Sequence, residues 1–289
     1  MARRFSTWIL LTTMSGFLLS CVATVGCVSK NSSQTPWKMK PQESFGLVVV
    51  KIKMSPFECT LSNKSGEKPC DVEEIGADTK IVTSVGSSIV VSHSKKQDKT
   101  YVLTAAHVCE VESQVETFPF ETKGNQYQIK VKNEVVSIEI IDYNGSKRSA
   151  SLYRLDKPND LCVVYTKDKW GHPFRVSSSM PSIGEKVFNV SSPHKIWSPG
   201  MVLMLDGYYS GKATNSFHHY TIPAKPGSSG SPVFNCEGEI VGMIQRATIG
   251  FENLALSTSV EAIREIVNSI PKDSQTPSLI NINLPKLEN

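Results

Sequence analysis

The chain has 289 residues, of which 39% are hydrophobic and 20% are charged, a composition typical of a folded globular protein. The 31 lysine and arginine residues only slightly outnumber the 27 acidic residues, and no basic stripe is interleaved with aromatic residues. Nucleic acid is therefore not an expected partner. The length suits one large domain or two small ones.

The first 27 residues have the pattern of an export signal, because two arginines precede an apolar stretch too short and interrupted for a membrane span. The tetrapeptide at 18–21, Leu-Leu-Ser-Cys, resembles the bacterial lipobox, whose cysteine is lipidated and becomes the mature N-terminus. We expect a lipoprotein held in the bacterial envelope through Cys21, with Cys27 as a weaker second candidate. The alternative is an ordinary secretion signal cut near Ala23.

The rest of the chain divides by composition into three parts. Residues 28–44 are polar, carry two prolines and are interpreted as a linker, and residues 271–289 are interpreted as a flexible tail. Residues 45–270 form the expected domain.

Short β-rich runs separated by turn residues fill this domain and favour an all-β fold, a barrel or a sandwich. One amphipathic helix is predicted at Ser259–Ile270, and a short helical turn is predicted around Ala105–Cys109. The expected strands are Gly46–Ile52, Ser87–Ser92, Tyr101–Thr104, Tyr127–Val131, Val135–Ile141, Leu161–Tyr165, Lys186–Val190, Met201–Leu205, Tyr220–Ile222, Pro232–Phe234 and Glu239–Ile244.

Export permits disulfides, and the chain has seven cysteines. Cys59 and Cys70 flank a polar loop and are the expected local bridge. Cys162 lies in an apolar run and is expected to be a buried thiol. The other pairings do not follow from the sequence, and no spacing suits a metal site.

Three segments carry residues suited to nucleophilic catalysis. Ser229 lies among glycines and prolines in the run at 226–234, which favours a nucleophile presented on a tight turn. A serine hydroxyl needs an adjacent base, and His107 follows an apolar strand and two small residues. Asp160 leads directly into a buried strand, so we prefer it as the orienting acid to Asp156, which is expected to serve a turn.

These residues resemble the motifs of the trypsin-like (chymotrypsin-fold) serine proteases. The motifs are Leu-Thr-Ala-Ala-His at 103–107, Asn-Asp-Leu at 159–161 and Gly-Ser-Ser-Gly-Ser-Pro at 227–232, in the order of that family. The pattern is most similar to the bacterial HtrA/Deg-type proteases and the glutamyl endopeptidases. Because few residues follow the expected helix, no PDZ domain of the HtrA kind is expected.

The resemblance implies two six-stranded antiparallel β-barrels, at about 45–165 and 175–258, followed by the helix at 259–270. It implies an exported serine endopeptidase that acts on protein or peptide substrates, passes through an acyl-enzyme and needs no cofactor or metal. Ser229 would attack the carbonyl, and His107 and Asp160 would be the base and its orienting acid. The backbone N–H groups of Gly227 and Ser229 would form the oxyanion hole.

The sequence departs from the family on both sides of Ser229. Ser228 replaces the usual Asp or Asn, so activation by cleavage as in trypsin is not expected, and Ser231 replaces a glycine. The resemblance also implies that Ile244, Gln245 and Arg246 border the substrate pocket. Ile244 stands where glutamyl endopeptidases place a pocket histidine, which argues against a preference for glutamate there, whereas Arg246 either favours acidic residues or is simply solvated. His218 and His219 are interpreted as a surface pair on a loop.

Two other functions compete with the peptidase. One is an inactive trypsin-like fold used as a binding module, against which the complete set of Ser229, His107 and Asp160 argues. The other is an esterase-type hydrolase that uses the same site, which assays with peptide and ester substrates would separate.

Overall fold

The computed structural model describes residues 40–63, 66–109, 115–122, 125–214, 216–248 and 250–271. The expected signal segment with Cys21 and Cys27, most of the linker and nearly all of the tail lie outside this range. The end of the expected linker, Pro41–Ser44, forms a 3-10 turn whose Ser44 Oγ accepts a hydrogen bond from His172 N–H at 2.7 Å. No helix within the described residues is long and apolar enough to cross a lipid bilayer.

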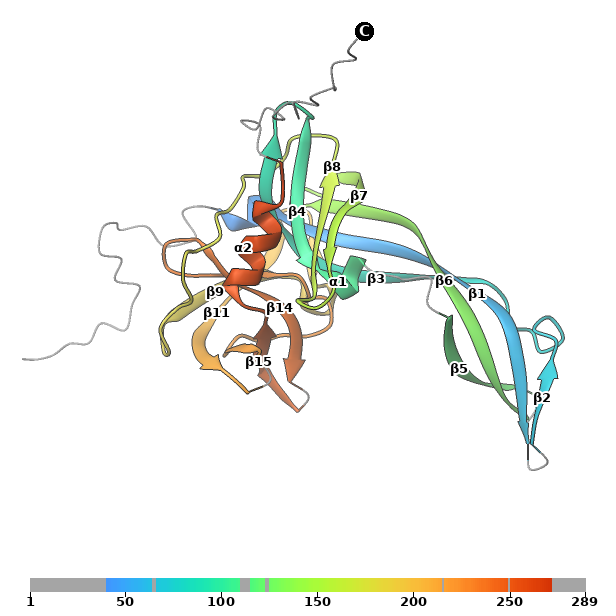
Figure 1. Cartoon of the computed structure of the whole chain (residues 1–289). Helices are drawn as coiled ribbons and strands as arrows, with labels where there is room; N and C mark the ends of the chain where they lie inside the picture. The colour runs from blue at the N-terminus through green and yellow to red at the C-terminus, as the bar shows by residue number, and fades with distance from the viewer. Residues whose placement is uncertain are drawn as a thin grey trace, which may run out of the picture.

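Six strands of the N-terminal half close into an antiparallel barrel (Figure 1). Around the barrel, neighbours follow the order β1, β3, β4, β8, β7, β6, and pairing between β1 and β6 closes the ring. The six strands are β1 (Phe45–Asn63), β3 (Lys80–Ser94), β4 (Lys99–Ala105), β6 (Asn125–Asp142), β7 (Lys147–Asp156) and β8 (Leu161–Thr166).

Six strands of the C-terminal half close in the same way, in the order β11, β12, β15, β14, β13, β9, with β9 pairing again with β11. A short strand, β10 (Trp197–Ser198), adds to the outside of β11. The ring contains β9 (Lys186–Ser191), β11 (Met201–Lys212), β12 (His218–Tyr220), β13 (Pro232–Phe234), β14 (Ile240–Thr248) and β15 (Phe251–Ser257). The predicted all-β fold of two six-stranded antiparallel barrels is confirmed.

The two predicted helical segments are present. Helix α2 (Val260–Asn268) begins after Ser259, whose Oγ accepts a hydrogen bond from Ala262 N–H and so caps the helix N-terminus. Its apolar face, with Ile263 and Ile266, joins a core that also contains Leu103 of the first barrel and Met243 of the second. Helix α2 therefore packs where the two barrels meet. The short turn is α1 (Ala106–Cys109).

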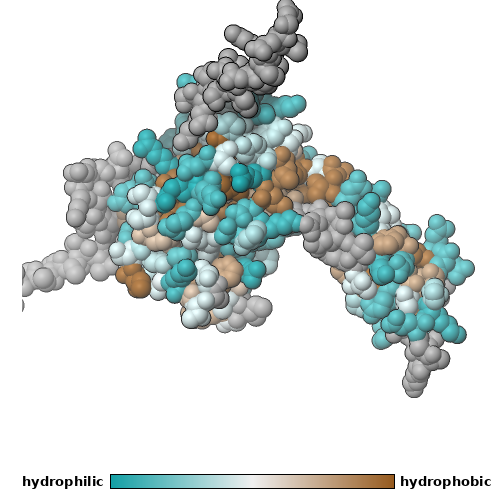
Figure 2. Space-filling view, in the orientation of Figure 1, coloured by the Kyte–Doolittle hydropathy of each residue, from teal (hydrophilic) through white to brown (hydrophobic). Residues whose placement is uncertain are grey.

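The ends of β1 and β6 run beyond the first barrel and form an arm with β2 (Gly66–Cys70) and β5 (Val115–Thr122). Figure 1 shows this arm projecting away from both barrels, and Figure 2 shows hydrophobic surface near its base. The predicted disulfide between Cys59 and Cys70 joins β1 to β2, and this is confirmed. The arm has a small core of its own, formed by Cys59, Ile129 and Val131.

Candidate active site

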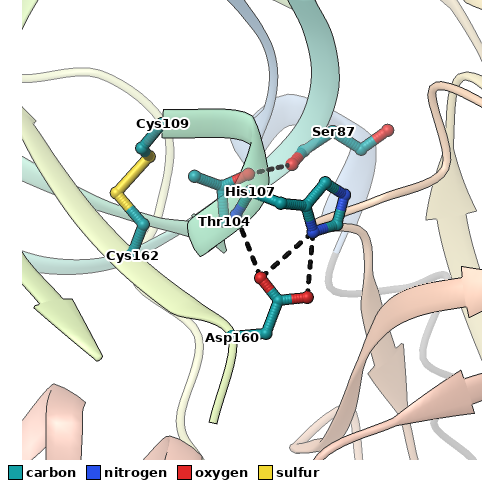
Figure 3. Close-up of a disulfide and its surroundings, with 6 residues drawn as sticks. All are labelled: Ser87, Thr104, His107, Cys109, Asp160 and Cys162. Carbon is teal, nitrogen blue, oxygen red and sulfur yellow. Dashed lines mark hydrogen bonds and ion pairs between the residues drawn. A yellow bond between two sulfur atoms is a disulfide. The ribbon is translucent and has the colours of Figure 1, made fainter. Parts of the chain in front are cut away.

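His107 and Asp160 lie in direct contact on the first barrel. His107 stands in α1, immediately after β4, and Asp160 occupies the turn before β8 with a φ of +51°. The imidazole Nδ1 lies 2.9 and 3.0 Å from the two carboxylate oxygens, and His107 N–H donates to Oδ1 at 3.0 Å (Figure 3). The carboxylate thus fixes the ring through its Nδ1 edge and leaves Nε2 for another partner.

A disulfide between Cys109 and Cys162 supports this pair. Each cysteine follows one member of the pair by two residues, and both are buried (Figure 3). The prediction of a buried thiol at Cys162 is therefore wrong, although its burial is right. An apolar run does not distinguish a buried thiol from a buried disulfide, because the partner lies 53 residues away in the sequence.

The turn that carries Ser229 comes from the second barrel and docks on the first. Ser229 C=O accepts a hydrogen bond from Ser87 N–H at 2.8 Å, and Gly230 N–H donates to Ile244 C=O at 2.7 Å. Gly230 has a φ of +83°, and a Cβ there would overlap Thr104 Oγ1 and Ser87 C=O. Only glycine suits this close approach between the two barrels.

The hydroxyl of Ser229 is half-buried and points to a neighbour other than the imidazole. Its Oγ donates to Gln245 C=O at 3.4 Å, and within the described residues it makes no hydrogen bond to His107. The side-chain amide of Gln245 in turn donates to the backbone carbonyls of Asn159 and, at 3.2 Å, Asp160. Gln245 therefore connects the serine turn to the acid turn.

The backbone beside Ser229 presents two N–H groups that have no acceptor among the described residues. His194 N–H donates to Pro226 C=O at 2.7 Å. Because the peptide bond between Pro226 and Gly227 is trans, the N–H of Gly227 points in the direction opposite to this carbonyl. The N–H groups of Ser228, Gly230 and Ser231 all make backbone hydrogen bonds, whereas in the described part of the chain those of Gly227 and Ser229 make none. Two free donors on one turn can bind a developing oxyanion.

The buried hydroxyl of Ser87 holds this turn in place. Ser87 Oγ donates to Gly227 C=O at 2.8 Å and accepts a hydrogen bond from Ser192 N–H at 3.1 Å. Gly227 has a φ of +98°, and a Cβ there would approach Ser192 C=O to 2.5 Å. The sequence did not indicate this contribution of Ser87, which was predicted only as the first residue of a strand.

The unusual neighbours of Ser229 also have partners. Ser228 is 1% exposed, and its Oγ accepts a hydrogen bond from Lys225 N–H at 3.3 Å. Ser231 is fully buried, and its Oγ accepts one from the side-chain amide of Asn189 at 2.9 Å. Hydrogen bonds between uncharged groups thus hold both side chains that depart from the family pattern.

Comparison with known proteins places this arrangement in a family. The trypsin-like peptidase domain matches residues 86–243, which is more than half of the chain. The chain belongs to the trypsin-like peptidases. This identifies it as a serine-type peptidase that acts on proteins or peptides.

Solved structures agree with the peptidase fold. A serine endoprotease from Yersinia pestis is 15% identical, with a TM-score of 0.52 over 82% of this chain and 67% of that chain. The HtrA-type protease AlgW, solved with a tripeptide, is 14% identical, with a TM-score of 0.52 over 83% of this chain and 64% of that chain. The comparison with curated proteins found no match.

The residues assigned to the substrate pocket of this trypsin-like peptidase differ in accessibility. Ile244 is 1% exposed in the core of the second barrel, and Gln245 is 3% exposed and bonded as described above. Arg246 is exposed, and its guanidinium lies 5.2 Å from the ring centre of Phe217. Of the three, only Arg246 has a charged group that a substrate could reach.

The histidine pair at 218–219 belongs to β12 and not to a surface loop, so that interpretation is wrong. His218 is buried, its ring stacks on that of Tyr209, and its Nδ1 lies 2.8 Å from Tyr209 Oη. His219, on the opposite face of the strand, is half-buried. Burial holds the pKa of His218 below the ordinary histidine value, because charging the ring would cost hydration.

Proposed function

We propose that the chain is an exported endopeptidase in which Ser229, His107 and Asp160 act together through an acyl-enzyme. The observation that carries this proposal is the contact of the Asp160 carboxylate with Nδ1 of His107 at 2.9 Å. This contact leaves Nε2 as the proton acceptor, as the base of a serine peptidase requires.

The reaction begins with rotation of the Ser229 side chain from Gln245 C=O toward the imidazole. His107 Nε2 takes the hydroxyl proton as Ser229 Oγ forms a bond to the scissile carbonyl carbon. The N–H groups of Gly227 and Ser229 stabilise the oxyanion, at about 2.7–4 kcal/mol per donor in comparable sites. The C–N bond then breaks, and the leaving amine takes the proton from His107.

Water completes the cycle. His107 accepts a proton from a water molecule that attacks the acyl carbon, and the proton returns to Ser229 Oγ as the ester bond breaks. Asp160 stays ionised and stabilises the imidazolium in both halves of the reaction.

Hydrolysis assays test this function. A casein digest and a matched pair of peptide and ester substrates are offered to the wild type and to the Ser229→Ala variant. We expect the wild type to cleave internal peptide bonds and the variant to lose at least about a thousandfold in kcat. Cleavage of the ester alone would favour the esterase.

One observation favours the inactive binding module as a second candidate, namely the hydrogen bond of Ser229 Oγ to Gln245 C=O in place of His107. Catalytic hydrogen bonds are often long or misaligned without substrate, so the peptidase remains our proposal. The absence of both peptide and ester hydrolysis by folded wild type would decide for the binding module.

We also propose export and membrane attachment through a lipid on Cys21. The signal pattern supports this, and the disulfides Cys59–Cys70 and Cys109–Cys162 suit an oxidising compartment. We expect the wild type in the membrane fraction and the Cys21→Ala variant outside it, with Cys27→Ala as the matched control. Continued membrane partition of Cys21→Ala would exclude this anchor.

A further inference from the structure

A cavity of about 340 Å³ opens beside the catalytic residues, on the side of β14 that faces the acid turn. Asp160 and Gln245 belong to its lining. Asp160 contacts His107, and Gln245 C=O accepts a hydrogen bond from the hydroxyl of Ser229. The cavity is therefore lined by residues that contact both His107 and Ser229.

Basic side chains outnumber acidic ones in the lining of the cavity. Lys157, Lys212 and Arg246 contribute to it, and all three are exposed. The acidic residue in the lining is Asp160, whose two carboxylate oxygens already bond the ring of His107. A negatively charged group in the cavity would thus be attracted by three cationic side chains, and the one carboxylate in the lining is already hydrogen-bonded to His107.

The N-terminus of α2 adds to the positive electrostatic potential in the cavity. Ser259, the N-cap of α2, lines the cavity, and the positive end of the helix dipole lies there. Glu261 stands in the first turn of α2, but it does not line the cavity.

Arg246 is held against an aromatic ring. Its guanidinium stacks on the Phe217 ring at 5.2 Å, and Phe217 is itself part of the cavity wall. A planar guanidinium held on a ring keeps its N–H donors for a carboxylate, which it can bind through two parallel hydrogen bonds.

We propose that this cavity binds an acidic side chain of the substrate, Asp or Glu, a few residues from the scissile bond. The proposal rests on the peptidase function above, and it gives a role to Gln245 and Arg246, which the sequence places beside the substrate pocket and which line this cavity. It makes the peptidase selective for acidic segments of its protein substrates.

A set of fluorogenic peptides tests this inference. The peptides share one cleavable sequence and carry Glu or Gln at each successive position on either side of the cleaved bond. We expect one position where Glu raises kcat/KM about five- to tenfold over Gln at low salt, and we expect this ratio to fall as salt is added.

Three variants locate the effect. Arg246→Gln should bring the Glu/Gln ratio close to one, and Lys212→Gln, at an exposed position, should lower it without risk to the core. Lys68→Gln removes the same charge from exposed β2 on the arm and should leave the ratio unchanged.

The outcomes separate this inference from the function beneath it. Hydrolysis by the wild type with a Glu/Gln ratio near one at every position would overturn the acidic cavity and leave the peptidase standing. A ratio that survives in both Arg246→Gln and Lys212→Gln would place the preference elsewhere and also overturn it. Absence of any hydrolysis would overturn the peptidase, and this inference with it.

Discussion

The side-chain amide of Gln245 donates to the backbone carbonyl of Asp160 at 3.2 Å, across the junction of the two barrels. Gln245 belongs to β14 of the second barrel, and Asp160 precedes β8 of the first. Since Gln245 C=O also accepts the Ser229 hydroxyl, one buried residue touches the turns of both the nucleophile and the acid.

Replacement of Gln245 should therefore lower catalysis more than substrate binding. In Gln245→Ala the carbonyls of Asn159 and Asp160 lose a buried donor, and the acid turn can shift relative to Ser229. We expect kcat to fall about tenfold or more with little change in KM. Steady-state kinetics and urea unfolding of the same samples check this. Unchanged kcat in a destabilised variant would show that Gln245 serves the fold alone.

The Cys109–Cys162 disulfide should matter for both stability and rate. The double variant Cys109→Ala/Cys162→Ala opens a link between residues 53 apart, so chain entropy alone predicts a loss of about 4 kcal/mol in unfolding free energy. Because each cysteine lies two residues after His107 or Asp160, kcat should fall as well. Urea unfolding and kinetics measure the two effects.

The matched control is Cys59→Ala/Cys70→Ala on the arm. Its cysteines are 11 residues apart, which predicts a smaller loss of about 3 kcal/mol, and the arm lies outside the catalytic region. We expect kcat of this control to be unchanged. An equal loss of kcat in both double variants would mean that the effect reflects general unfolding.

The oxyanion turn should tolerate no side chain at Gly227. A Cβ there meets Ser192 C=O at 2.5 Å on a backbone with φ of +98°, so Gly227→Ala must displace the Gly227 N–H. We expect a loss of about 10²–10³ in kcat, as for removal of one oxyanion donor.

Gly184→Ala provides the control for backbone strain. Gly184 also has a positive φ, +84°, but nothing lies within 4 Å of its Cβ position. This variant should lose stability and keep its kcat. If Gly227→Ala behaves no differently from Gly184→Ala, the N–H of Gly227 takes no part in the reaction.

Buried His218 should make the protein less stable in acid. Burial lowers its pKa in the folded state, so below about pH 6.5 the unfolded chain binds a proton that the folded chain resists. The contribution of His218 is therefore complete above that pH and declines as the pH falls below it. Thermal unfolding across this range should show a shallower decline in Tm for His218→Gln than for the wild type.

The control for this effect is His219→Gln, which changes the half-buried neighbour on the other face of β12. Its Tm should follow the wild-type pH dependence. Parallel profiles for the wild type and His218→Gln would assign the acid sensitivity to another group.

The strands of the barrels were predicted well from the sequence where nearly all of their residues are buried and apolar. In β8 (Leu161–Thr166) five of six residues are buried, and the β-branched run is visible without any structure. None of the residues of β7 (Lys147–Asp156) is buried, and this strand was not predicted because it forms through pairing with β8 and has no apolar run of its own. The sequence predicted two strands, Tyr127–Val131 and Val135–Ile141, where the structure has the single strand β6. Polar residues around Asn133 interrupt the apolar pattern, but β6 pairs with β1 without interruption at this point.

The site was predictable to a similar degree. His107, Asp160 and Ser229 stand in motifs that local chemistry makes visible, and the structure brings His107 and Asp160 into contact. The role of Gln245 was not visible, because its amide bonds to backbone carbonyls, which every residue has. The support from Ser87 was hidden for the same reason, since its hydroxyl bonds Gly227 C=O at 140 residues' distance in sequence.

Labelling with a fluorophosphonate, followed by mass mapping of the modified peptide, tests the central claim most directly. We predict a single covalent adduct on Ser229, abolished in Ser229→Ala and strongly slowed in His107→Ala, since the hydroxyl then lacks its base. An adduct that persists in Ser229→Ala, or a folded wild type that takes no label, would contradict the assignment of Ser229 as an activated nucleophile.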